Sequence, residues 1–197
     1  MSRQAERSDA TRASLVRAAR ELFAEQGYAD VGTEEIVRRA RVTRGALYHH
    51  FEDKRDLFRA VHEQLEKELA ERIGVELGGS GSDDPIEALR TAVRIFLDAC
   101  TEPELARIAL IDAPSVLGWE EWRRIDEKYG LGLTIAGLNM GMEAGRLRRQ
   151  PVRPLAHLLL AAMGEAGMVL ANANDPEAAR AEVEPALLGL LEGLEKR

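Results

Sequence analysis

A group of side chains in the first third of the chain has the chemistry of surface recognition rather than of bond cleavage. The guanidinium of Arg44 can bind guanine O6 and N7 in bidentate fashion, or it can bind a phosphate alone. Thr43 can contact a phosphate or a thymine methyl group, and Tyr48 can donate its hydroxyl to a phosphate while its ring packs on a sugar. His49 can also contact a phosphate, and Gly45 has no side chain to obstruct a close approach. These residue types at this spacing predict contact with duplex DNA.

Two short helices are needed to present this group. Thr33 can cap a helix that runs to about Ala40, with two acidic residues in its first turn, where the helix dipole favours them. A tight break follows at Arg41, and Thr43 can cap a second helix that runs to about Phe51. Two such helices joined by a short turn form a helix-turn-helix, whose second helix enters the major groove of DNA.

The stretch from Gly27 to Phe58 resembles the DNA-binding domain of the TetR family of bacterial repressors. Arg41 departs from the family's pattern, which usually has Gly at this turn, because Gly enters φ > 0 without a Cβ penalty. Arg41 therefore either tolerates about 1 kcal/mol of strain or bends the turn differently, and it adds a cation beside the second helix. The matching residues are Gly27-Tyr28, Thr33, Ile36, Ala40, Val42-Thr43, Gly45, Leu47-Tyr48, His50-Phe51, Lys54 and Leu57-Phe58.

The resemblance implies a role for further residues. Thr33 and Lys54 lie at helix N-termini, where backbone N–H groups already favour phosphate, and the family uses these positions to clamp the DNA backbone. Phosphate contacts position such a protein, whereas base contacts give it sequence preference. With one headpiece per subunit, a two-fold dimer needs a roughly palindromic operator on double-stranded DNA. The expected function is therefore that of a DNA-binding transcriptional regulator, most simply a repressor.

The charge distribution agrees with this expectation. The whole chain has a formal net charge of −7, which by itself argues against DNA binding. Residues 1–60, however, hold twelve Lys and Arg against ten Asp and Glu, and the remainder holds fifteen against twenty-four. Between residues 38 and 59 there are seven basic and three acidic side chains. A basic headpiece on an acidic body suits a DNA reader whose body is repelled from the duplex.

Catalytic and metal-binding patterns are missing from the sequence. The four histidines show no HExxH or paired-ligand spacing, and no nucleophile motif occurs. Cys100 is the only cysteine, so neither an intrachain disulfide nor a thiolate zinc site can form, and we expect it to be a small buried apolar residue. We therefore expect no enzyme, metal or cofactor. An all-α enzyme that uses His157 and Glu165 is the remaining alternative of that class.

The N-terminal segment and the lengths of the apolar runs indicate where in the cell the protein is expected. Residues 1–10 are polar and charged, so they do not form a signal peptide. We expect them to be a flexible arm, in which Arg3 and Arg7 either follow the DNA backbone or remain solvated. The longest uncharged apolar runs are shorter than the ~20 residues needed to span a bilayer. A cytoplasmic protein without a membrane partner is expected.

Helical periodicity and the absence of strand-like alternation predict an all-α fold, with a three-helix headpiece and a larger C-terminal helical domain. We expect a DNA-binding domain at residues 1–52, a linking helix at 53–77, and an effector-binding and dimerisation domain at 78–197. Apolar residues at i+4 intervals mark the linking helix, and a Gly- and Ser-rich flexible loop follows at 78–85. The body is expected to form helices at about 86–100, 105–111, 119–129, 131–147, 155–173 and 177–194.

The body is expected to hold an effector site. Inducer-binding repressors of the family have an apolar pocket that, when filled, moves the linking helix and separates the headpieces. Gly137, Gly141 and Gly145 share one helical face, which predicts either close packing or a pliable pocket wall. The expected effector is a lipophilic small molecule. The candidate lining residues are Phe96, Trp119, Trp122, Tyr129, Met140, Met163 and Met168, with His157, Glu165 and Asn172 as polar groups.

The last two helices are rich in apolar residues, which suggests a self-associating pair. In the family resembled, the two C-terminal helices form a four-helix interface with their symmetry mates, so a homodimer through residues 155–194 is expected. Two alternatives to an effector-released repressor stay open. One is a DNA-binding adaptor that needs no effector and recruits another protein through its body, and the other is an activator.

Overall fold

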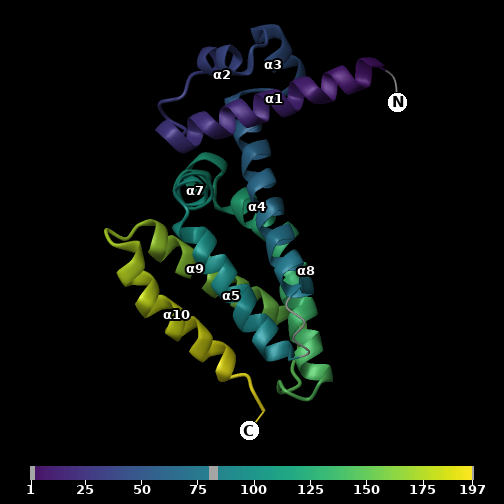
Figure 1. Cartoon of the computed structure of the whole chain (residues 1–197), viewed down its shortest axis with the longest axis vertical. Helices are drawn as coiled ribbons and strands as arrows, with labels where there is room; N and C mark the ends of the chain where they lie inside the picture. Colours follow the sequence, from purple (N-terminus) through teal and green to yellow (C-terminus); the bar gives the residue numbers. More distant parts are fainter. Residues whose placement is uncertain (1–2, 80–83, 197) are drawn as a thin grey trace.

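The computed structural model describes residues 3–79 and 84–196, and within these ranges it contains helices and no β-strand. The molecule is elongated, with α1–α3 gathered at one end and α4 running from them down the length of the body (Figure 1). This arrangement confirms the predicted all-α fold. The helices are α1 (Arg3–Gln26), α2 (Thr33–Ala40), α3 (Arg44–His50), α4 (Lys54–Gly79), α5 (Pro85–Thr101), α6 (Pro103–Leu105), the π-helix η1 (Ala106–Asp112), α7 (Ala113–Leu117), α8 (Trp119–Glu143), α9 (Val152–Ala171) and α10 (Pro176–Glu192).

The headpiece is built around an aromatic cluster in which α1 meets the start of α4. Phe23 and Phe58 are fully buried, and their ring centroids lie 5.2 Å apart in an edge-on arrangement. Tyr28 adds a third ring 5.1 Å from that of Phe58. Ile36 of α2 and Leu47 of α3 complete this core without exposure to solvent. Burying these side chains, at roughly 1.5–3 kcal/mol each, fixes α2 and α3 on the rigid platform of α1 and α4.

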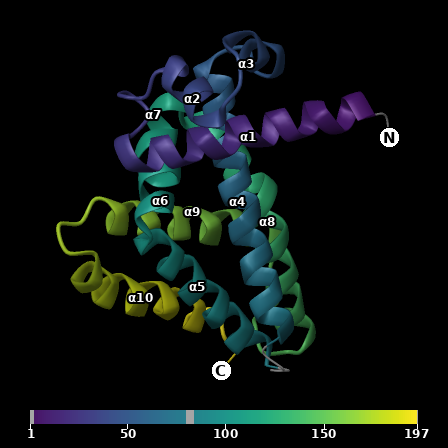
Figure 2. The ribbon, with the colours of Figure 1, turned by 45° about the horizontal axis from the view of Figure 1, so that its top comes forward.

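α4 is the structural link between the two ends of the molecule. Its buried residues recur every fourth position from Leu57 to Ile73, as the sequence predicted. The N-terminal members belong to the headpiece core and the C-terminal members to the body core. The headpiece core also takes in Trp122 and Ile125 of α8, so the two ends share packed side chains. Figure 2 shows α8 running beside α4 along the body.

Several predicted boundaries in the body were wrong. Pro114 lies in the first turn of α7, directly after the helix predicted at 105–111. The chain before it forms the π-helix η1. The two helices predicted at 119–129 and 131–147 form the single helix α8, since Gly130 packs inside it: a Cβ there would lie 2.9 Å from Leu160. Gly145 lies beyond α8 with φ of 70°, so it ends the helix rather than packing on its face.

The N-terminal residues and the loop after α4 also differ from expectation. Residues 3–10 are helical and extend α1, so the predicted flexible arm is wrong over that range. Residues 80–83 of the predicted flexible loop lie outside the described residues. α4 continues through Gly79, and Asp84 caps α5 by accepting a hydrogen bond from the N–H of Ile86 at 2.9 Å.

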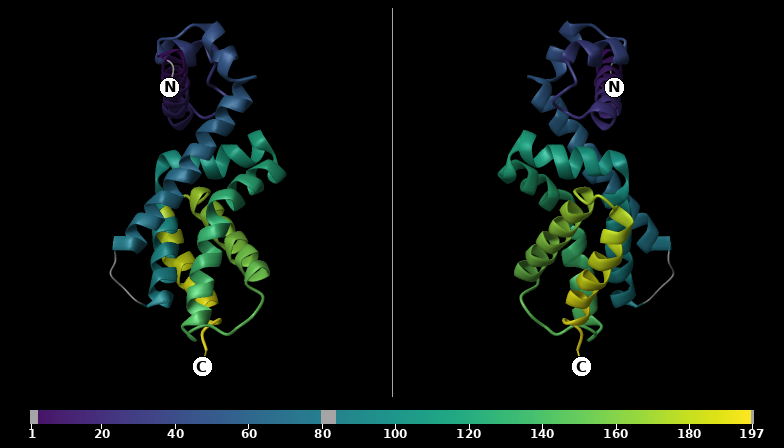
Figure 3. Two further views of the ribbon diagram at one scale, coloured as in Figure 1. Left: turned by 90° about the vertical axis from the view of Figure 1, so that its right-hand side faces the viewer. Right: turned by 90° about the vertical axis from the view of Figure 1, so that its left-hand side faces the viewer.

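Helices α9 and α10 lie together on one side of the body (Figure 3). In the described part of the chain, α9 alone is long and apolar enough to cross a membrane by length and composition, with a mean hydropathy of 1.5. Arg153 and Glu165 interrupt its uncharged run, and 44% of its apolar window is buried inside the body. These features are those of a core helix in a helical domain.

Candidate nucleic-acid interface and internal cavity

The turn between α2 and α3 is closed by a left-handed residue. Arg41 has φ of 57° and ψ of 41°, and it is the only non-glycine residue with positive φ in the described ranges. Its N–H donates to Arg38 O at 3.2 Å, and the N–H of Val42 donates to Val37 O at 3.0 Å. This pair of hydrogen bonds forms a Schellman motif, which requires a left-handed residue at that position. Arg41 therefore keeps the usual turn and tolerates the strain, with its side chain exposed.

Thr43 and Gly45 shape the start of α3. Thr43 caps the helix as predicted, because its hydroxyl oxygen accepts a hydrogen bond from the N–H of Ala46 at 3.2 Å. Gly45 is exposed, and a Cβ at this position would meet only Thr43 Oγ1 at 3.9 Å. The headpiece therefore does not require glycine here, although glycine in a helix costs up to ~1 kcal/mol relative to alanine.

Arg44 and Tyr48 form the centre of the exposed face of α3. The Arg44 guanidinium carbon lies 5.6 Å from the centroid of the Tyr48 ring, and the Tyr48 side chain is 45% exposed. Hydrogen bonds from Thr33 and then from Arg44 lower the pKa of the Tyr48 phenol. Glu34 lies 3.9 Å from Arg44, but both side chains are largely exposed and this pair is weak.

Thr33 occupies a slightly different helical position from the one predicted. Gly32 is the N-cap of α2, with extended φ and ψ, and Thr33 is the first helical residue. Glycine can serve as an N-cap because it adopts the extended conformation freely. The Thr33 hydroxyl is thereby directed to Tyr48 and joins α2 to the face of α3.

Two histidines and an arginine border this face. His49 is exposed, and its ring centroid lies 5.2 Å from that of His50. Burial, followed by the nearby His49 and Arg12, lowers the pKa of His50, which packs towards Phe51. Arg12 of α1 is exposed and lies with its guanidinium 5.2 Å from the centroid of the Phe51 ring. The sequence did not single out Arg12, because only the packing of α1 against α3 brings it to this surface.

Lys54 is half-buried at the start of α4, where it contacts the loop between α1 and α2. Its ammonium donates to Tyr28 O at 2.8 Å and to Val31 O at 2.9 Å, and it lies 4.0 Å from the centroid of the Tyr28 ring. Burial lowers its pKa. Two of its three protons are thus used to close the loop between α1 and α2. At the same helix end, Asp53 caps α4 by accepting a hydrogen bond from the N–H of Asp56 at 2.7 Å.

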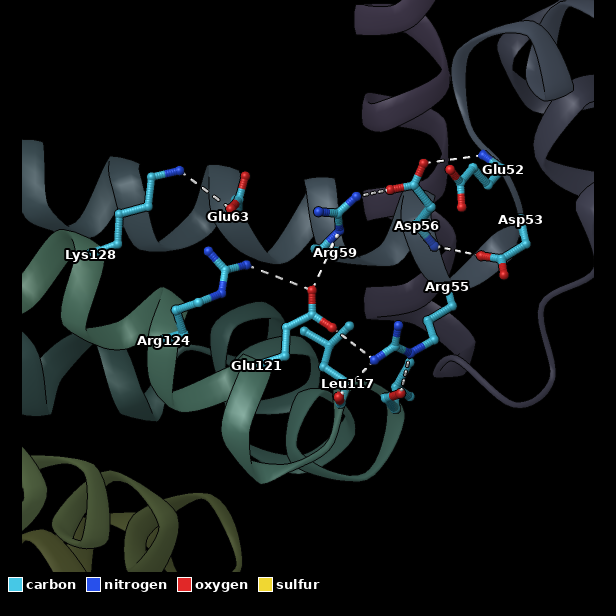
Figure 4. Close-up of polar contacts among 11 residues, drawn as sticks. Glu52, Asp53, Arg55, Asp56, Arg59, Glu63, Leu117, Glu121, Arg124 and Lys128 are labelled. Carbon is cyan, nitrogen blue, oxygen red and sulfur yellow. Dashed lines mark hydrogen bonds and ion pairs between the residues drawn. The ribbon is translucent and has the colours of Figure 1, made fainter.

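A polar joint connects the start of α4 to α7 and α8 (Figure 4). Arg55 donates to Val116 O at 3.0 Å and to Leu117 O at 2.8 Å, at the C-terminal end of α7. Its guanidinium also pairs with Glu121 of α8 at 2.8 Å, and Glu121 lies 3.7 Å from Arg59. We call these residues the α4–α8 joint. Because Arg55 is in the first turn of α4, the joint connects the headpiece end directly to the body.

The body contains a cavity of about 250 Å³ between α4, α5, α8, α9 and α10. Its walls are mostly apolar, with residues such as Leu69, Ile73 and Leu89. Gly137 of α8 allows Leu89 of α5 to come close, since a Cβ on Gly137 would lie 2.6 Å from Leu89 Cδ2. Close packing at this glycine is therefore observed. α4 forms one wall, so the helix that carries the headpiece also borders the cavity.

Four predicted pocket residues line this cavity, namely Phe96, Tyr129, Met140 and Met163. The other six lie elsewhere. Trp122 is buried on the headpiece side and donates to Ala109 O at 3.0 Å, whereas Trp119 is exposed beside it. His157 lies 3.3 Å from Glu127, Glu165 is exposed on α9, and Met168 packs between the two cores. Asn172 caps α9 and donates to Met168 O at 2.8 Å.

The polar groups of the cavity are ones that the sequence did not single out. Glu66 of α4 and Asp126 of α8 both line it. Glu66 lies between the core residues Leu65 and Leu69 in the sequence, at a position that would be exposed on an isolated helix. It is enclosed because α8 packs across α4. No group of three or more His, Cys, Asp or Glu in the described residues is placed to hold a metal ion.

Comparisons with known proteins agree with this arrangement. The family model described as "Bacterial regulatory proteins, tetR family" matches residues 15–61, and "Tetracyclin repressor-like, C-terminal domain" matches residues 86–194. The chain is 29% identical over 160 residues to the Transposon Tn10 TetC protein of Escherichia coli, covering 79% of this chain and 78% of that protein.

Solved structures give the same result. A TetR-family transcriptional regulator from Pectobacterium atrosepticum is 33% identical, with a TM-score of 0.86 over 100% of this chain and 99% of that chain. RolR in complex with resorcinol shares the fold at 22% identity, with a TM-score of 0.75 over 94% of this chain and 89% of that chain. The chain belongs to the TetR family, and it is a DNA-binding transcriptional regulator rather than an enzyme.

Proposed function

We propose that the protein is a cytoplasmic repressor that binds a palindromic operator as a homodimer and leaves it when a small lipophilic effector fills the cavity. The observation that carries this proposal is the position of α4, which supports the headpiece at one end and forms a wall of the cavity further along. A ligand that favours one spacing of α4 and α8 would therefore change the position of the headpiece. Such a ligand shifts the population of the two states by its difference in affinity for them.

The DNA-contacting surface in this proposal is the outer face of α3 with the turn before it. Arg44 reads a base edge, while Thr43, Tyr48 and His49 contact phosphates, and Gly45 permits the close approach. Thr33 and Arg41 add backbone contacts from α2 and the turn. Lys54 holds the α1–α2 loop through its two hydrogen bonds to carbonyl groups. Its third ammonium proton and the backbone N–H groups in the first turn of α4 are then available to contact a phosphate.

The proposed dimer interface is the outer side of α9 and α10, within residues 155–194. On α9, Leu158 is 70% exposed and Val169 is 45% exposed, with the exposed Ala161 and Glu165 between them on the same helical stripe. On α10, Leu190 is 55% exposed. Exposed large apolar residues on two adjacent helices are typical of a surface that another protein covers. A two-fold axis beside this surface would place a second copy of both helices against it.

The α4–α8 joint is the proposed route from cavity to headpiece. Glu121 contacts both Arg55 and Arg59 of α4. Movement of α8 relative to α4 would therefore either break these ion pairs or move the start of α4 together with α8. Because Arg55 also binds the carbonyl groups at the end of α7, the first turn of α4 cannot move independently of α7 and α8. Packed interfaces of this kind favour a switch between discrete arrangements over a continuous deformation.

Two measurements test the proposal. Light scattering at micromolar concentration should give the mass of a dimer, and Leu158→Glu should give that of a monomer; a monomeric wild-type chain would contradict the proposed interface. Deleting the gene should raise transcription from the promoters that the protein occupies. A fall in transcription would instead identify an activator.

A further inference from the structure

The cavity is apolar except for a small acidic end. Its charged lining residues in the described part of the chain are Glu66 and Asp126, and no Lys, Arg or His is among them. The aromatic residues Phe96 and Tyr129 line the same space. A buried acid without a cation is costly, since the charged form loses its hydration without gaining a partner. Two of them in one cavity therefore need an explanation beyond packing.

Glu66 has no partner that would stabilise its charge. None of the hydrogen bonds between described residues reaches its carboxyl group, and its side chain is 16% exposed. The nearest nitrogen is Nδ1 of His62, at 3.9 Å, and both ring nitrogens of this fully buried histidine are without hydrogen-bond partners. Burial, followed by the charge of Asp126, raises the pKa of Glu66 to about 8, so this carboxyl group is mainly protonated at neutral pH.

The negative charge of Asp126 is only partly balanced by a nearby cation. Its Oδ2 atom is buried without a hydrogen bond, and the nearest cation is Arg123 Nη1, at 3.7 Å. The same guanidinium also pairs with Glu127 at 3.2 Å and donates to His157 O at 3.3 Å. Burial raises the pKa of Asp126 to about 6. One ionised carboxylate and one protonated carboxyl group therefore face the cavity near pH 7.

We propose that the effector is a lipophilic cation, an alkyl or aralkyl ammonium, whose charged head lies between Glu66 and Asp126 and whose apolar body fills the rest of the cavity. This inference rests on the proposed role of the cavity as the effector site. The cation supplies the missing counter-charge, and Phe96 and Tyr129 add aromatic rings to the lining of the same cavity. The Tyr129 ring already lies against one cation, since Lys128 Nζ is 4.9 Å from its centroid. A neutral molecule of equal size gains the apolar contacts alone, and an anion is repelled by Asp126.

The proposal includes a proton balance. When a permanent cation binds, the O–H bond of the Glu66 carboxyl group breaks and its proton passes to solvent, which leaves two carboxylates around one cation. Other groups near Glu66 are His62 on α4, Asp126 and Tyr129 of α8, which line the cavity with it, and the buried thiol of Cys100 on α5. Arg123 pairs with Asp126. His62 stays neutral, because burial lowers its pKa to about 4.

The test uses three probes with the same tail: octyltrimethylammonium, octanol and octanoate. Isothermal titration calorimetry of the full chain below their micellar concentrations should give at least ten-fold tighter binding of the ammonium than of the alcohol, with octanoate weakest. Between pH 6 and 8 the ammonium affinity should rise by up to about ten-fold per pH unit, as release of one proton requires. Equal affinities for ammonium and alcohol, or an affinity that does not change with pH, would overturn the inference.

Matched variants locate the head. Glu66→Gln keeps the shape of the protonated side chain, so it should fold, and it should lose both the preference for ammonium and the pH dependence. Glu76→Gln changes an exposed acid on the same helix and should retain both. If Glu66→Gln binds the ammonium as tightly as wild type, the head does not lie at Glu66. Should this variant fail to fold, the wild-type probe series and its pH profile still decide the matter.

Titrations with and without operator DNA separate this inference from the proposed function. Release of DNA by octyltrimethylammonium, but not by octanol, supports both. Tight ammonium binding that leaves DNA affinity unchanged supports the ligand class and overturns the effector role of the cavity. Release by octanol or octanoate alone supports the effector role and overturns the ligand class.

Discussion

At the scale of single residues, the outer face of α3 is held in place by contacts within the headpiece. Hydrogen bonding with Thr33 and then Arg44 lowers the pKa of the Tyr48 phenol, and the Arg44 guanidinium lies over the Tyr48 ring. These contacts limit the number of conformations that Arg44 would lose in the proposed contact with DNA. Thr43 fixes the first turn through its hydrogen bond to the N–H of Ala46. The surface is therefore preorganised before it binds.

Replacing Arg44 tests whether it reads a base. Arg44→Ala should cost about 1–3 kcal/mol at the operator and much less on unrelated duplexes, because a base contact is lost. Gel-shift titrations with the operator and with an unrelated duplex measure the ratio of the two affinities. Arg149→Ala, which removes an exposed arginine from the body, is the matched control. An equal loss on all sequences would make Arg44 a phosphate ligand.

Arg41 is expected to show opposite effects on stability and on DNA binding. Arg41→Gly should raise the free energy of unfolding by up to ~1 kcal/mol, because glycine adopts the left-handed conformation without strain. It should also weaken binding to all duplexes and reduce the salt dependence by about one phosphate contact. Urea unfolding and salt titrations measure the two effects. Lower stability in the variant would mean that the Arg41 side chain makes a contact worth more than the strain.

At the scale of elements, the packing of α4 against α8 connects cavity and headpiece. The sequence predicted α4 well, since its i+4 apolar series is continuous, and it predicted the Thr43 cap from residue type alone. It did not predict Glu66 and Asp126 as cavity residues, because their proximity depends on how two helices pack. The sequence analysis also divided α8 into two helices at Gly130. This division was wrong because glycine and proline end a helix only where packing does not compensate for their cost. The sequence also misplaced Trp122, which was expected to line the pocket but packs in the headpiece core.

Glu121 should affect the response to effector more than the binding of effector. Glu121→Gln removes the charge that pairs with Arg55 and Arg59, so the effector-induced fall in DNA affinity should shrink while effector affinity in the absence of DNA stays near the wild-type value. The adjacent exposed Glu120→Gln is the control. Fluorescence anisotropy with labelled operator gives both quantities. A variant with full release and unchanged DNA affinity would exclude the joint as the connection.

Gly137 offers a test of the cavity wall. Gly137→Ala places a methyl group 2.6 Å from the present position of Leu89 Cδ2 and should push that side chain into the cavity. Effector affinity should fall by roughly ten-fold, about 1.4 kcal/mol, with DNA binding in the absence of effector retained. Gly132→Ala, on the same helix with nothing near its Cβ, should instead raise stability by up to ~1 kcal/mol. Unchanged effector affinity in Gly137→Ala would place the ligand elsewhere.

At the scale of the whole molecule, the buried ionisable groups predict how stability depends on pH. The pKa of Glu66 rises from 4.5 to about 8 on folding, so its contribution is fully present below 4.5 and is lost as the pH rises towards 8. Asp126 acts in the same direction, with its pKa raised from 3.8 to about 6. His62 acts oppositely: its pKa falls from 6.5 to about 4, so stability is lost as the pH falls through that range.

Thermal melts across this range check the assignment. Glu66→Gln should melt at least several degrees above wild type at pH 8.5 and close to wild type at pH 4.5, because only the ionised form of Glu66 is unfavourable in the fold. Glu76→Gln, with an exposed side chain, should follow the wild-type curve. A Glu66→Gln curve parallel to that of wild type would mean that Glu66 does not titrate abnormally.

Recognition of a specific, two-fold symmetric DNA site by the exposed face of α3 is best tested by a DNase footprint over the DNA flanking the gene, at near-physiological salt. We expect a protected palindrome with half-sites about one helical turn or more apart, with protection lost in Arg44→Ala. If the protein showed no salt-dependent binding to any duplex, α3 would not be a DNA-recognition helix.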